Sequence, residues 1–332
     1  MSSAPTVLVT GGAGYVGGHT CKQLAAAGFV PVAYDNLGTG HRWAVRWGPF
    51  EEGDINDTER LGAVLVRHKP VAVMHFAAHS VASESVSDPD KYYRNNVVGT
   101  LALLNTMRVA RVNSFVFSSS AAVYGNPQKT PIPEDHATHP INPYGASKLM
   151  VEQMLQDFYH AYGLNWASLR YFNAAGADPD GLIGEAHAPE THVVPLAIEA
   201  ALGKRSGFQL FGTDYPTPDG TAIRDYVHVT DLAVAHVLAL RHLLAAQSCL
   251  TLNLGTGNGH SVRDVLGAVE RVSGRSIVTH AAPRRPGDPP ILVADPDRAW
   301  RLLGWRAQHT GLDAMVGSAW RWHARREDVV IP

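Results

Sequence analysis

Residues 6–17 read TVLVTGGAGYVG, and this stretch decides the fold. The first five residues are apolar or β-branched, which predicts a short buried strand. Gly12, Gly14 and Gly17 then stand in GxGxxG spacing. Between a strand and a helix, such glycines permit a tight turn, let the backbone approach a pyrophosphate, and let the helix pack on the strand. Because the helix that starts here offers free N–H groups to phosphate, the stretch predicts a dinucleotide-binding turn.

Strand-like and helix-like segments alternate from this turn to about residue 175. The predicted helices span residues 14–27, 57–67, 89–110 and 143–162, and they separate predicted strands at residues 30–34, 71–76, 114–118 and 165–171. This alternation predicts an α/β fold, a Rossmann-type doubly wound parallel sheet with helices on both faces. We expect residues 1–175 to form this dinucleotide-binding domain.

A smaller mixed α/β domain is predicted for residues 176–332, where the alternation stops. Residues 176–189 and 212–221 are rich in Gly, Pro and Asp, which is typical of loops. Short helices and strands follow, and some of them can return to the first sheet. Length supports the division, because 332 residues at ~150 per domain suggest about two domains. The second domain is expected to bind the substrate.

Composition narrows the function classes. The chain is 45% hydrophobic and 17% charged, with a formal net charge of −2. A large core is therefore expected, and a nucleic-acid partner is not, since no basic patch stands out. No apolar run approaches the ~18 residues of a membrane span, and the N-terminus lacks the pattern of a signal peptide. We expect a soluble, cytoplasmic protein. Two cysteines and 17 histidines without ligand spacing predict no metal site.

An acidic residue, Asp35, ends the second predicted strand and is followed by Asn36. An acid at this place accepts a hydrogen bond from the adenosine ribose and repels a 2′-phosphate. Because no arginine follows it, NAD is favoured over NADP as the cofactor. An ordinary strand–turn–helix with a solvated aspartate is the alternative, since glycine clusters are common in turns; the strand before, the helix after and the acid at Asp35 together favour the dinucleotide site.

A tyrosine and a lysine, Tyr144 and Lys148, lie four residues apart within a predicted helix and so on one helix face. A phenol with its ordinary pKa of about 10 is a poor base, but the lysine charge and a positive nicotinamide would lower that pKa. Ser120 ends a predicted strand upstream and can hydrogen-bond the same substrate oxygen. The three residues together favour a catalytic set over an exposed helix face. Ser118 and Ser119 are interpreted as strand-end residues with structural partners.

Motifs along the chain resemble a known family. The first half carries TGGAGYVG (10–17), HFAA (75–78), NNVVGT (95–100), SSSAAVYG (118–125), YGASK (144–148) and RYFNAAG (170–176), as in the extended short-chain dehydrogenase/reductase family. The second half carries GEAH (184–187), DYPTPDGT (214–221), IRDYVHVTDLA (223–233), NLGTG (253–257) and RRPGD (284–288). These motifs are similar to the UDP-glucose 4-epimerase branch of that family.

The resemblance implies roles for individual residues. Tyr144 would be the base, Lys148 its partner on the nicotinamide ribose, and Ser120 the catalytic serine. Together with these three, the implied NAD contacts are Gly11, Gly12, Gly14, Tyr15, Val16, Gly17, Asp35, Asn36, Asp54, Ile55, Phe76, Ala77, Asn95 and Phe172. With Ser120 and Tyr144, the implied UDP-sugar contacts are Asn173, His192, Val193, Gln209, Phe211, Arg224, Arg285, Asp288 and Leu292.

The implied activity is that of an isomerase. It would interconvert UDP-glucose and UDP-galactose by transient oxidation at C4 with tightly bound NAD, through a 4-keto sugar that rotates in the site. UDP-N-acetylhexosamines stay open as substrates, since Leu292 stands where family members carry either a bulky tyrosine or a smaller residue. UDP-pentoses stay open as well, since the segment from GEAH (184–187) to PETH (189–192) resembles members that act on UDP-pentoses. Nucleotide-sugar dehydratases and decarboxylases carry an acid after the catalytic serine, where this chain has Ala121 and Ala122.

The sequence departs from the family pattern at two further positions, and the resemblance also implies how the chain assembles. Ser80 stands where well-known members carry a lysine near the cofactor, and His192 stands where an asparagine often binds the substrate. A non-catalytic NAD-binding member is disfavoured, because Tyr144 and Lys148 are both present. A homodimer is implied, through the predicted helices at residues 89–110 and 143–162.

Overall fold

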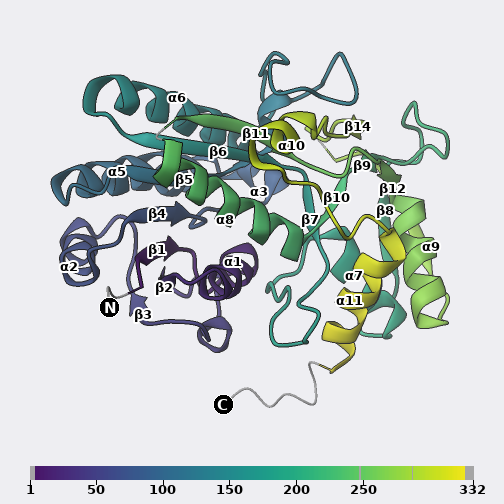
Figure 1. Ribbon diagram of the computed structural model, residues 1–332. Helices are drawn as coiled ribbons and strands as arrows, with labels where there is room; N and C mark the ends of the chain where they lie inside the picture. The colour runs from purple at the N-terminus through teal and green to yellow at the C-terminus, as the bar shows by residue number, and fades with distance from the viewer. Residues whose placement is uncertain (1–3, 247, 286, 326–332) are drawn as a thin grey trace.

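A seven-stranded parallel sheet forms the centre of the protein in the computed structural model, which describes residues 4–246, 248–285 and 287–325 (Figure 1). The strand order is β11-β6-β5-β4-β1-β2-β3. The strands are β1 (Thr6–Thr10), β2 (Val30–Asp35), β3 (Phe50–Glu52), β4 (Ala72–His75), β5 (Ser114–Ser120), β6 (Asn165–Tyr171) and β11 (Leu250–Leu254). The predicted doubly wound parallel sheet is confirmed. The outer parts of the two predicted domains, residues 1–3 and 326–332, lie outside the described residues.

Helices cover both faces of this sheet. One face packs against α1 (Tyr15–Ala26), α8 (Val229–Ala246) and α10 (Asp297–Leu303), whose apolar residues share one core with β1, β6 and β11. The other face packs against α2 (Thr58–His68), α5 (Thr100–Val109) and α6 (Pro143–Tyr162) in a second core. Because both faces are covered, the inner strands are buried along nearly their whole length.

The second half adds a smaller assembly beside the sheet (Figure 1). Its core lies between α7 (Val193–Ala201), α9 (Val262–Ser273), α11 (Leu312–Arg325) and β8 (Phe208–Phe211). Short strands complete it: β7 (Asn173–Ala175) pairs with β10 (Tyr226–His228), β9 (Ile223–Arg224) with β12 (His260–Ser261) and β14 (Ile291–Leu292), and β8 with β13 (Thr279–Ala282). β11 and α8, also from the second half, belong to the central sheet and its covering layer.

The predicted helix at residues 89–110 has three parts. α4 (Pro89–Tyr92) leads into a π-helical stretch, η2 (Tyr93–Gly99), and then into α5. In η2 the Asn96 side-chain amide donates to the His79 carbonyl and to the Ser147 hydroxyl. The wider π turn is common at functional sites, and it shifts the helix register over too few residues for apolar periodicity to show it. The short helices α3 (Ala82–Ser87), η1 (Arg42–Ala44) and η3 (Ala121–Tyr124) were likewise not predicted.

Helix α8 corrects the expectation that no segment approaches a membrane span. Among the described residues it is the one helix that is long and apolar enough, with 18 residues and a mean hydropathy of 1.4. Its inner residues, including Leu232, Ala235 and Leu240, pack in the core against the sheet. Such a composition is what a covered helix of a doubly wound sheet requires, so it is weak support for a membrane segment.

Four buried histidines lie within or beside the central sheet. His75 contacts the hydroxyls of Thr10 and Thr100 at 2.7 and 2.9 Å, joining β4 to β1 and α5. Burial lowers the pKa of His75 to about 3 and the pKa of His19, His228 and His236 to about 4. These side chains are therefore neutral in the folded protein at pH values where the unfolded chain begins to bind protons.

We predict that these histidines destabilise the fold in mild acid. An unfolded histidine with a pKa near 6.5 gains a proton as the pH falls, whereas the buried one does not, so each costs about 1.4 kcal/mol between pH 7.5 and 5.5. In His236→Gln, the loss of unfolding free energy between these pH values should therefore be smaller by about that amount. Urea titrations at both pH values measure it. The exposed His160→Gln serves as the control, and an equal pH effect in wild type and His236→Gln would contradict the prediction.

Candidate active site

The glycine turn between β1 and α1 depends on close backbone contacts. Gly11 has a φ of +74°, and a Cβ there would lie 2.7 Å from the backbone nitrogen of Ala77 at the end of β4. A Cβ on Gly12 would lie 2.8 Å from the side chain of Ala33, and one on Gly17 would lie 2.1 Å from the Gly11 carbonyl oxygen. These three glycines are required by the fold itself.

Gly14 differs from the other glycines of the turn. A Cβ there would meet only the Gly11 carbonyl oxygen, at 3.2 Å. Gly14 is also the N-cap of α1, and no side chain caps this helix end. The turn therefore presents open backbone and uncapped N–H groups, which is the surface that a dinucleotide pyrophosphate needs. The residues present thus fit NAD at this place.

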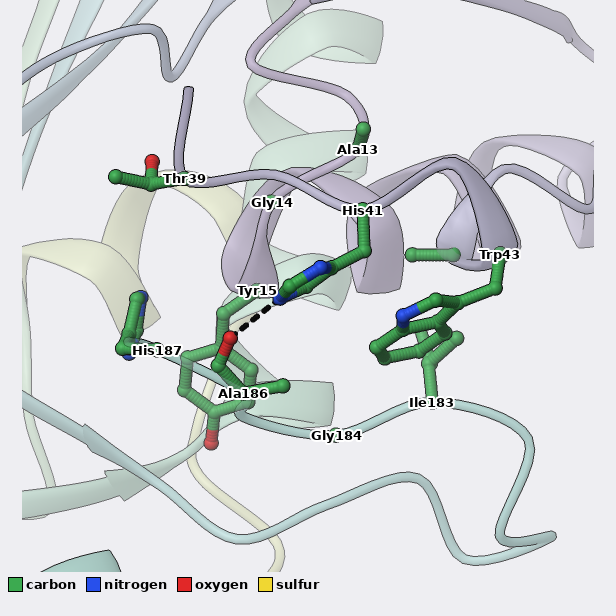
Figure 2. Close-up of a pocket in the computed structure, with 11 residues that line it drawn as sticks. Ala13, Gly14, Tyr15, Thr39, His41, Trp43, Ile183, Gly184, Ala186 and His187 are labelled. Carbon is green, nitrogen blue, oxygen red and sulfur yellow. Dashed lines mark hydrogen bonds between the residues drawn. The ribbon is translucent and has the colours of Figure 1, made fainter. Parts of the chain in front are cut away.

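A segment of the second half faces this turn. Figure 2 shows residues 183–187 opposite Gly14 and Tyr15, with His41 reaching across to the backbone. The Nε2 of His41 lies 2.5 Å from the Ala186 carbonyl oxygen, and the Tyr15 hydroxyl donates to the Gly176 carbonyl at 2.5 Å. The space enclosed between this segment and the turn is about 10 Å³, so the segment packs closely against the side of the turn that it covers.

The acid predicted to hold the adenosine ribose lies at the end of β2, as the sequence indicated. Asp35 is buried and accepts hydrogen bonds from the backbone of Ala13 and Leu37 at 3.0 and 2.9 Å. Burial raises the pKa of this carboxyl, and the two backbone donors oppose that shift. Its neighbour Asn36 donates to Asp54 at 2.7 Å, which links the segments that follow β2 and β3.

The other predicted NAD contacts follow strand ends or the π stretch. Phe76 and Ala77 directly follow β4, and the Phe76 ring lies 4.8 Å from the ring of His236. Asn95 lies in η2 and donates to Asn96 at 2.9 Å. Three more residues lie at the start of α1, after β3 and after β6: Val16, Ile55 and Phe172. The carboxyl ends of parallel strands meet at one edge of a sheet, where a dinucleotide binds.

Tyr144, Ser120 and Lys148 come together at this edge. Ser120 ends β5, Tyr144 lies in the first turn of α6, and a hydrogen bond joins their side chains. The Lys148 ammonium donates to the Ser118 carbonyl at 2.8 Å and lies 5.8 Å from the centre of the Tyr144 ring. The ammonium therefore has a partner in the backbone of β5 while it faces the phenol.

Burial acts on both titratable groups of this set. It raises the pKa of Tyr144, and the hydrogen bond from Ser120 opposes the rise. It lowers the pKa of Lys148 to about 7, against the attraction of Glu152. The sequence predicts a lowered phenol pKa beside the lysine and a positive nicotinamide; among the chain's own residues, desolvation exceeds the opposing hydrogen bond from Ser120 and raises that pKa.

Ser118 and Ser119 have structural partners. Ser118 shares a 2.5 Å hydrogen bond with the Tyr171 hydroxyl, and Ser119 donates to Glu152 at 2.7 Å. Glu152 also accepts from Ser168 and forms a buried ion pair with Arg170 at 2.5 Å. These side-chain partners could not be predicted from the sequence, since each lies 16 or more residues along the chain from the group it contacts.

A groove of about 490 Å³ is lined by Arg285 and Asp288, two of the residues predicted to contact UDP. Arg224, from β9, is buried and ion-paired with Asp288, so its charge is partly compensated. Arg285 lies with its guanidinium 4.1 Å from the centre of the Phe211 ring, and burial lowers its pKa. The arrangement leaves Arg285 as a desolvated cation that an anionic group would stabilise.

Two groove residues were not predicted, although their motifs were. Tyr215 and Arg284 line the groove, and the Arg284 guanidinium lies 4.4 Å from the Tyr215 ring and pairs with Asp214. Other predicted substrate residues lie apart from the groove lining. Asn173 begins β7, Gln209 is exposed on β8, and Leu292 is buried on β14. His192 and Val193 form the N-cap and first residue of α7.

Comparisons with known proteins agree with this geometry. Residues 7–255 match the NAD dependent epimerase/dehydratase family. The chain is 55% identical over 320 residues to the UDP-glucose 4-epimerase of Rhizobium leguminosarum bv. trifolii, covering 96% of this chain and 98% of that protein. The UDP-glucose 4-epimerase of Brucella ovis, solved in complex with NAD, has a TM-score of 0.93 and 53% identity, with 96% and 98% of the two chains covered.

A third relative was solved with a nucleotide sugar. This UDP-glucose-4-epimerase from Stenotrophomonas maltophila holds NAD and formylated UDP-arabinopyranose, with a TM-score of 0.94, 41% identity, and 98% and 100% of the two chains covered. The chain therefore belongs to the NAD-dependent epimerase/dehydratase family. Within it, the relatives at this identity are UDP-glucose 4-epimerases, so the resemblance read from the motifs is confirmed. The protein is an isomerase, and its cofactor is NAD.

We predict that two alanine substitutions in the turn act on different properties: Gly17→Ala on the stability of the fold, and Gly14→Ala on NAD binding. Gly17→Ala forces a Cβ against a backbone oxygen that cannot yield, so the unfolding free energy should fall by about 1–3 kcal/mol or more. Gly14→Ala should cost less than about 1 kcal/mol but reduce bound NAD, since the methyl group occupies the open side of the turn. Urea unfolding and the NAD content of purified protein measure the two effects. Equal stability losses with NAD retained in both variants would contradict this assignment.

Proposed function

We propose that the protein interconverts UDP-glucose and UDP-galactose by inverting C4 of the sugar. The observation that carries this proposal is the Tyr144–Ser120–Lys148 set at the carboxyl edge of the sheet, on the same edge as the glycine turn. The second observation is the groove that contains Arg285 and Asp288. The near-full-length similarity to UDP-glucose 4-epimerases supports the choice of substrate.

The cofactor and substrate roles of single residues belong to this proposal. Backbone N–H groups at Tyr15 and Val16 would bind the pyrophosphate of NAD, and Asp35 its adenosine ribose. Arg285 and Arg224 would hold the diphosphate of the UDP-sugar, with Asp288 releasing part of its pairing with Arg224. The Phe211 ring, which lies against Arg285 on the same face of β8 as the exposed Gln209, would face the uracil.

The residues then divide the work between proton transfer and anchoring. NAD, when bound, supplies an acceptor that takes a hydride from C4 and returns it. Tyr144 removes the proton of the 4-hydroxyl, and Ser120 holds that oxygen by a hydrogen bond. The Lys148 ammonium, together with the positive nicotinamide of bound NAD, would stabilise the phenolate by charge and oppose the rise in pKa that burial causes. Because the diphosphate is held and the sugar is not, the 4-keto sugar can turn its other face to the cofactor before the phenol returns the proton.

The size of the sugar pocket determines which UDP-sugars the protein accepts as substrates. Leu292 is buried in a small apolar cluster with Ala121, Phe172 and Ala294. A leucine here is smaller than tyrosine, which supports room for an N-acetyl group. A UDP-pentose is the second candidate substrate, because the Stenotrophomonas relative holds formylated UDP-arabinopyranose.

A panel of UDP-hexoses, UDP-N-acetylhexosamines and UDP-pentoses tests both proposals. Without added cofactor, purified protein should carry NAD and convert UDP-glucose to UDP-galactose catalytically. Consumption of NAD in proportion to product would mean a dehydrogenase instead. Absence of turnover of UDP-N-acetylglucosamine would rule out the proposed role of Leu292.

Replacing the proposed base should separate chemistry from binding. Tyr144→Phe removes only the hydroxyl, so we expect epimerisation to fall by about 10²–10⁴-fold while the NAD content stays the same. The control is Tyr171→Phe, which removes the neighbouring buried phenol bonded to Ser118 and should retain most activity. Rates from chromatographic product analysis decide. A wild-type rate in Tyr144→Phe would show that another group is the base.

Three further proposals concern organisation. We place the proposed NAD-binding domain at residues 1–175 and the UDP-sugar domain at residues 176–332, with β11 and α8 joining the first.

A homodimer would form through α5, η2 and α6, which expose Val98, Leu101 and Met150; a monomer in analytical ultracentrifugation would contradict it. A cytoplasmic location fits the free thiols of Cys21 and Cys249; recovery of the protein in the periplasmic or membrane fraction would contradict it.

A further inference from the structure

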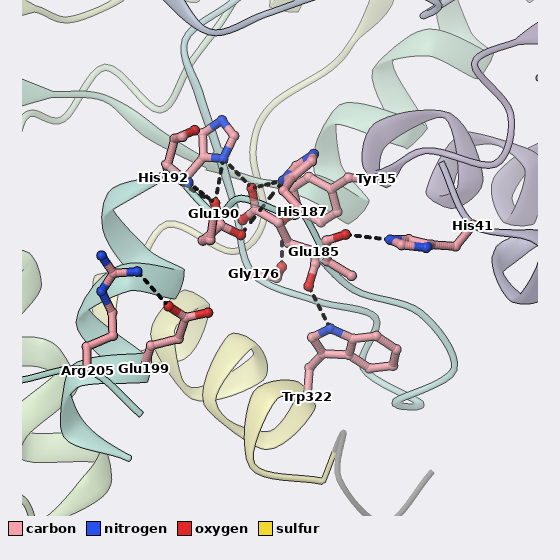
Figure 3. Close-up of polar contacts among 12 residues, drawn as sticks. Tyr15, His41, Gly176, Glu185, His187, Glu190, His192, Glu199, Arg205 and Trp322 are labelled. Atoms are coloured by element: carbon pink, nitrogen blue, oxygen red, sulfur yellow. Dashed lines mark hydrogen bonds and ion pairs between the residues drawn. The ribbon is translucent and has the colours of Figure 1, made fainter. Parts of the chain in front are cut away.

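Two glutamates and two histidines converge on one point beside the glycine turn. Glu185, His187, Glu190 and His192 each turn one nitrogen or oxygen toward the others, and these four atoms lie within 4.8 Å of one another. Figure 3 shows both imidazoles directed at the two carboxylates, with the ring of Tyr15 next to them. Both glutamate side chains are more than nine-tenths buried.

The spacing of the four atoms resembles a coordination shell. The Nδ1 of His192 lies 2.8 Å from Glu185 and 3.0 Å from Glu190, and the Nδ1 of His187 lies 3.2 and 3.8 Å from the same two carboxylates. A tetrahedral zinc ion with ligands at about 2.0–2.2 Å places its ligand atoms about 3.3–3.6 Å apart. The observed separations lie on both sides of this value, so a small cation fits between the four atoms with minor side-chain movement.

Hydrogen bonding within the protein does not satisfy this cluster. Among the described residues, the buried Nδ1 of His187 has no well-directed partner, although a carboxylate oxygen lies 3.2 Å away. One oxygen of Glu185 is approached by both imidazoles, and the single Nδ1 of His192 faces both carboxylates. Two neutral imidazoles and two carboxylates carry a charge of −2, which a divalent cation balances.

We propose that Glu185, His187, Glu190 and His192 bind a divalent metal ion of the zinc type. Two imidazole nitrogens and two carboxylate oxygens form the mixed ligand set that zinc accepts, and four protein ligands make a closed, structural site. The ion would be redox-inactive, and His192 would serve as its ligand in place of the substrate contact that the family resemblance implied. The sequence missed this site because the ligand spacing, Glu-x-His-x-x-Glu-x-His, lies in an irregular segment and matches no common zinc motif.

The surrounding structure holds the ligands in place. The Trp322 indole donates to the Glu185 carbonyl at 2.9 Å, and the backbone of Thr191 and His192 donates to Glu190 at 2.7 and 2.9 Å. Such outer contacts orient the ligands of a metal before it binds. The ion would fasten the 183–192 segment to the start of α7 next to Tyr15, and thereby to one wall of the NAD turn.

A cluster of protonated histidines is the alternative way to balance the charge. Burial lowers the pKa of both imidazoles, but the glutamates outweigh it and raise the pKa to about 9 for His187 and about 10 for His192. In that case the protein contains no metal, and chelators leave its stability unchanged. The two possibilities therefore differ in a measurable way.

Metal content of the full-length protein tests the proposal. Protein stripped with EDTA is incubated with zinc sulfate, desalted, and analysed by plasma mass spectrometry. We expect one zinc ion per chain, and a rise in the melting temperature when zinc is added. His187→Gln and Glu190→Gln should weaken zinc binding roughly a hundredfold or more and abolish the rise. Neither measurement depends on turnover, so the result is independent of the proposed epimerase activity.

Matched variants outside the cluster separate specific from general effects. Glu199→Gln and His160→Gln remove the same kinds of side chain from exposed pairs, and both should bind zinc as the wild type does. Circular dichroism and NAD content show that each variant is folded. The proposal is overturned if the desalted wild type retains no more zinc than His187→Gln, or if EDTA and zinc leave its melting temperature unchanged.

Discussion

The backbone contact between α1 and the turn before it is the constraint on which the rest of the structure depends. A Cβ on Gly17 would lie 2.1 Å from the Gly11 carbonyl oxygen, so the helix lies directly against the turn. That approach directs the uncapped N-terminus of α1 along the carboxyl edge of the sheet. The other proposed NAD contacts are arranged around the same edge, because β2, β4 and β5 run parallel to β1.

A buried ion pair then sets the place of the proposed catalytic set on that edge. Glu152 of α6 pairs with Arg170 of β6 and accepts a hydrogen bond from Ser119 of β5. Buried charges persist only where partners satisfy them, so this network holds α6 in a defined position against both strands. Tyr144 and Lys148 belong to that helix, and Ser120 follows Ser119. Their alignment is thus a property of the sheet and its helix, whereas the groove for the UDP-sugar is built mostly from loops.

Much of the fold and of the proposed catalytic set could be predicted, because the signals are local. The glycine turn, Asp35 at a strand end and the Tyr144–Lys148 pair each lie within a few residues of the element that positions them. The π stretch Tyr93–Gly99 was missed, since it differs from an α-helix by one residue per turn. The apolar composition of α8 was missed too, and this composition is explained by the packing of α8 against the central sheet.

By itself the sequence determined the parallel α/β architecture, the NAD turn and the residue types of the Tyr–Ser–Lys set. These follow from periodicity, from glycine stereochemistry and from spacing along one helix. Only the tertiary structure decided which distant groups meet: Arg224 with Asp288, Ser118 with Tyr171, and the Trp322 indole with the backbone carbonyl of Glu185. It also decided the direction of the Tyr144 pKa, because desolvation depends on what surrounds a group in space and not on its neighbours along the chain.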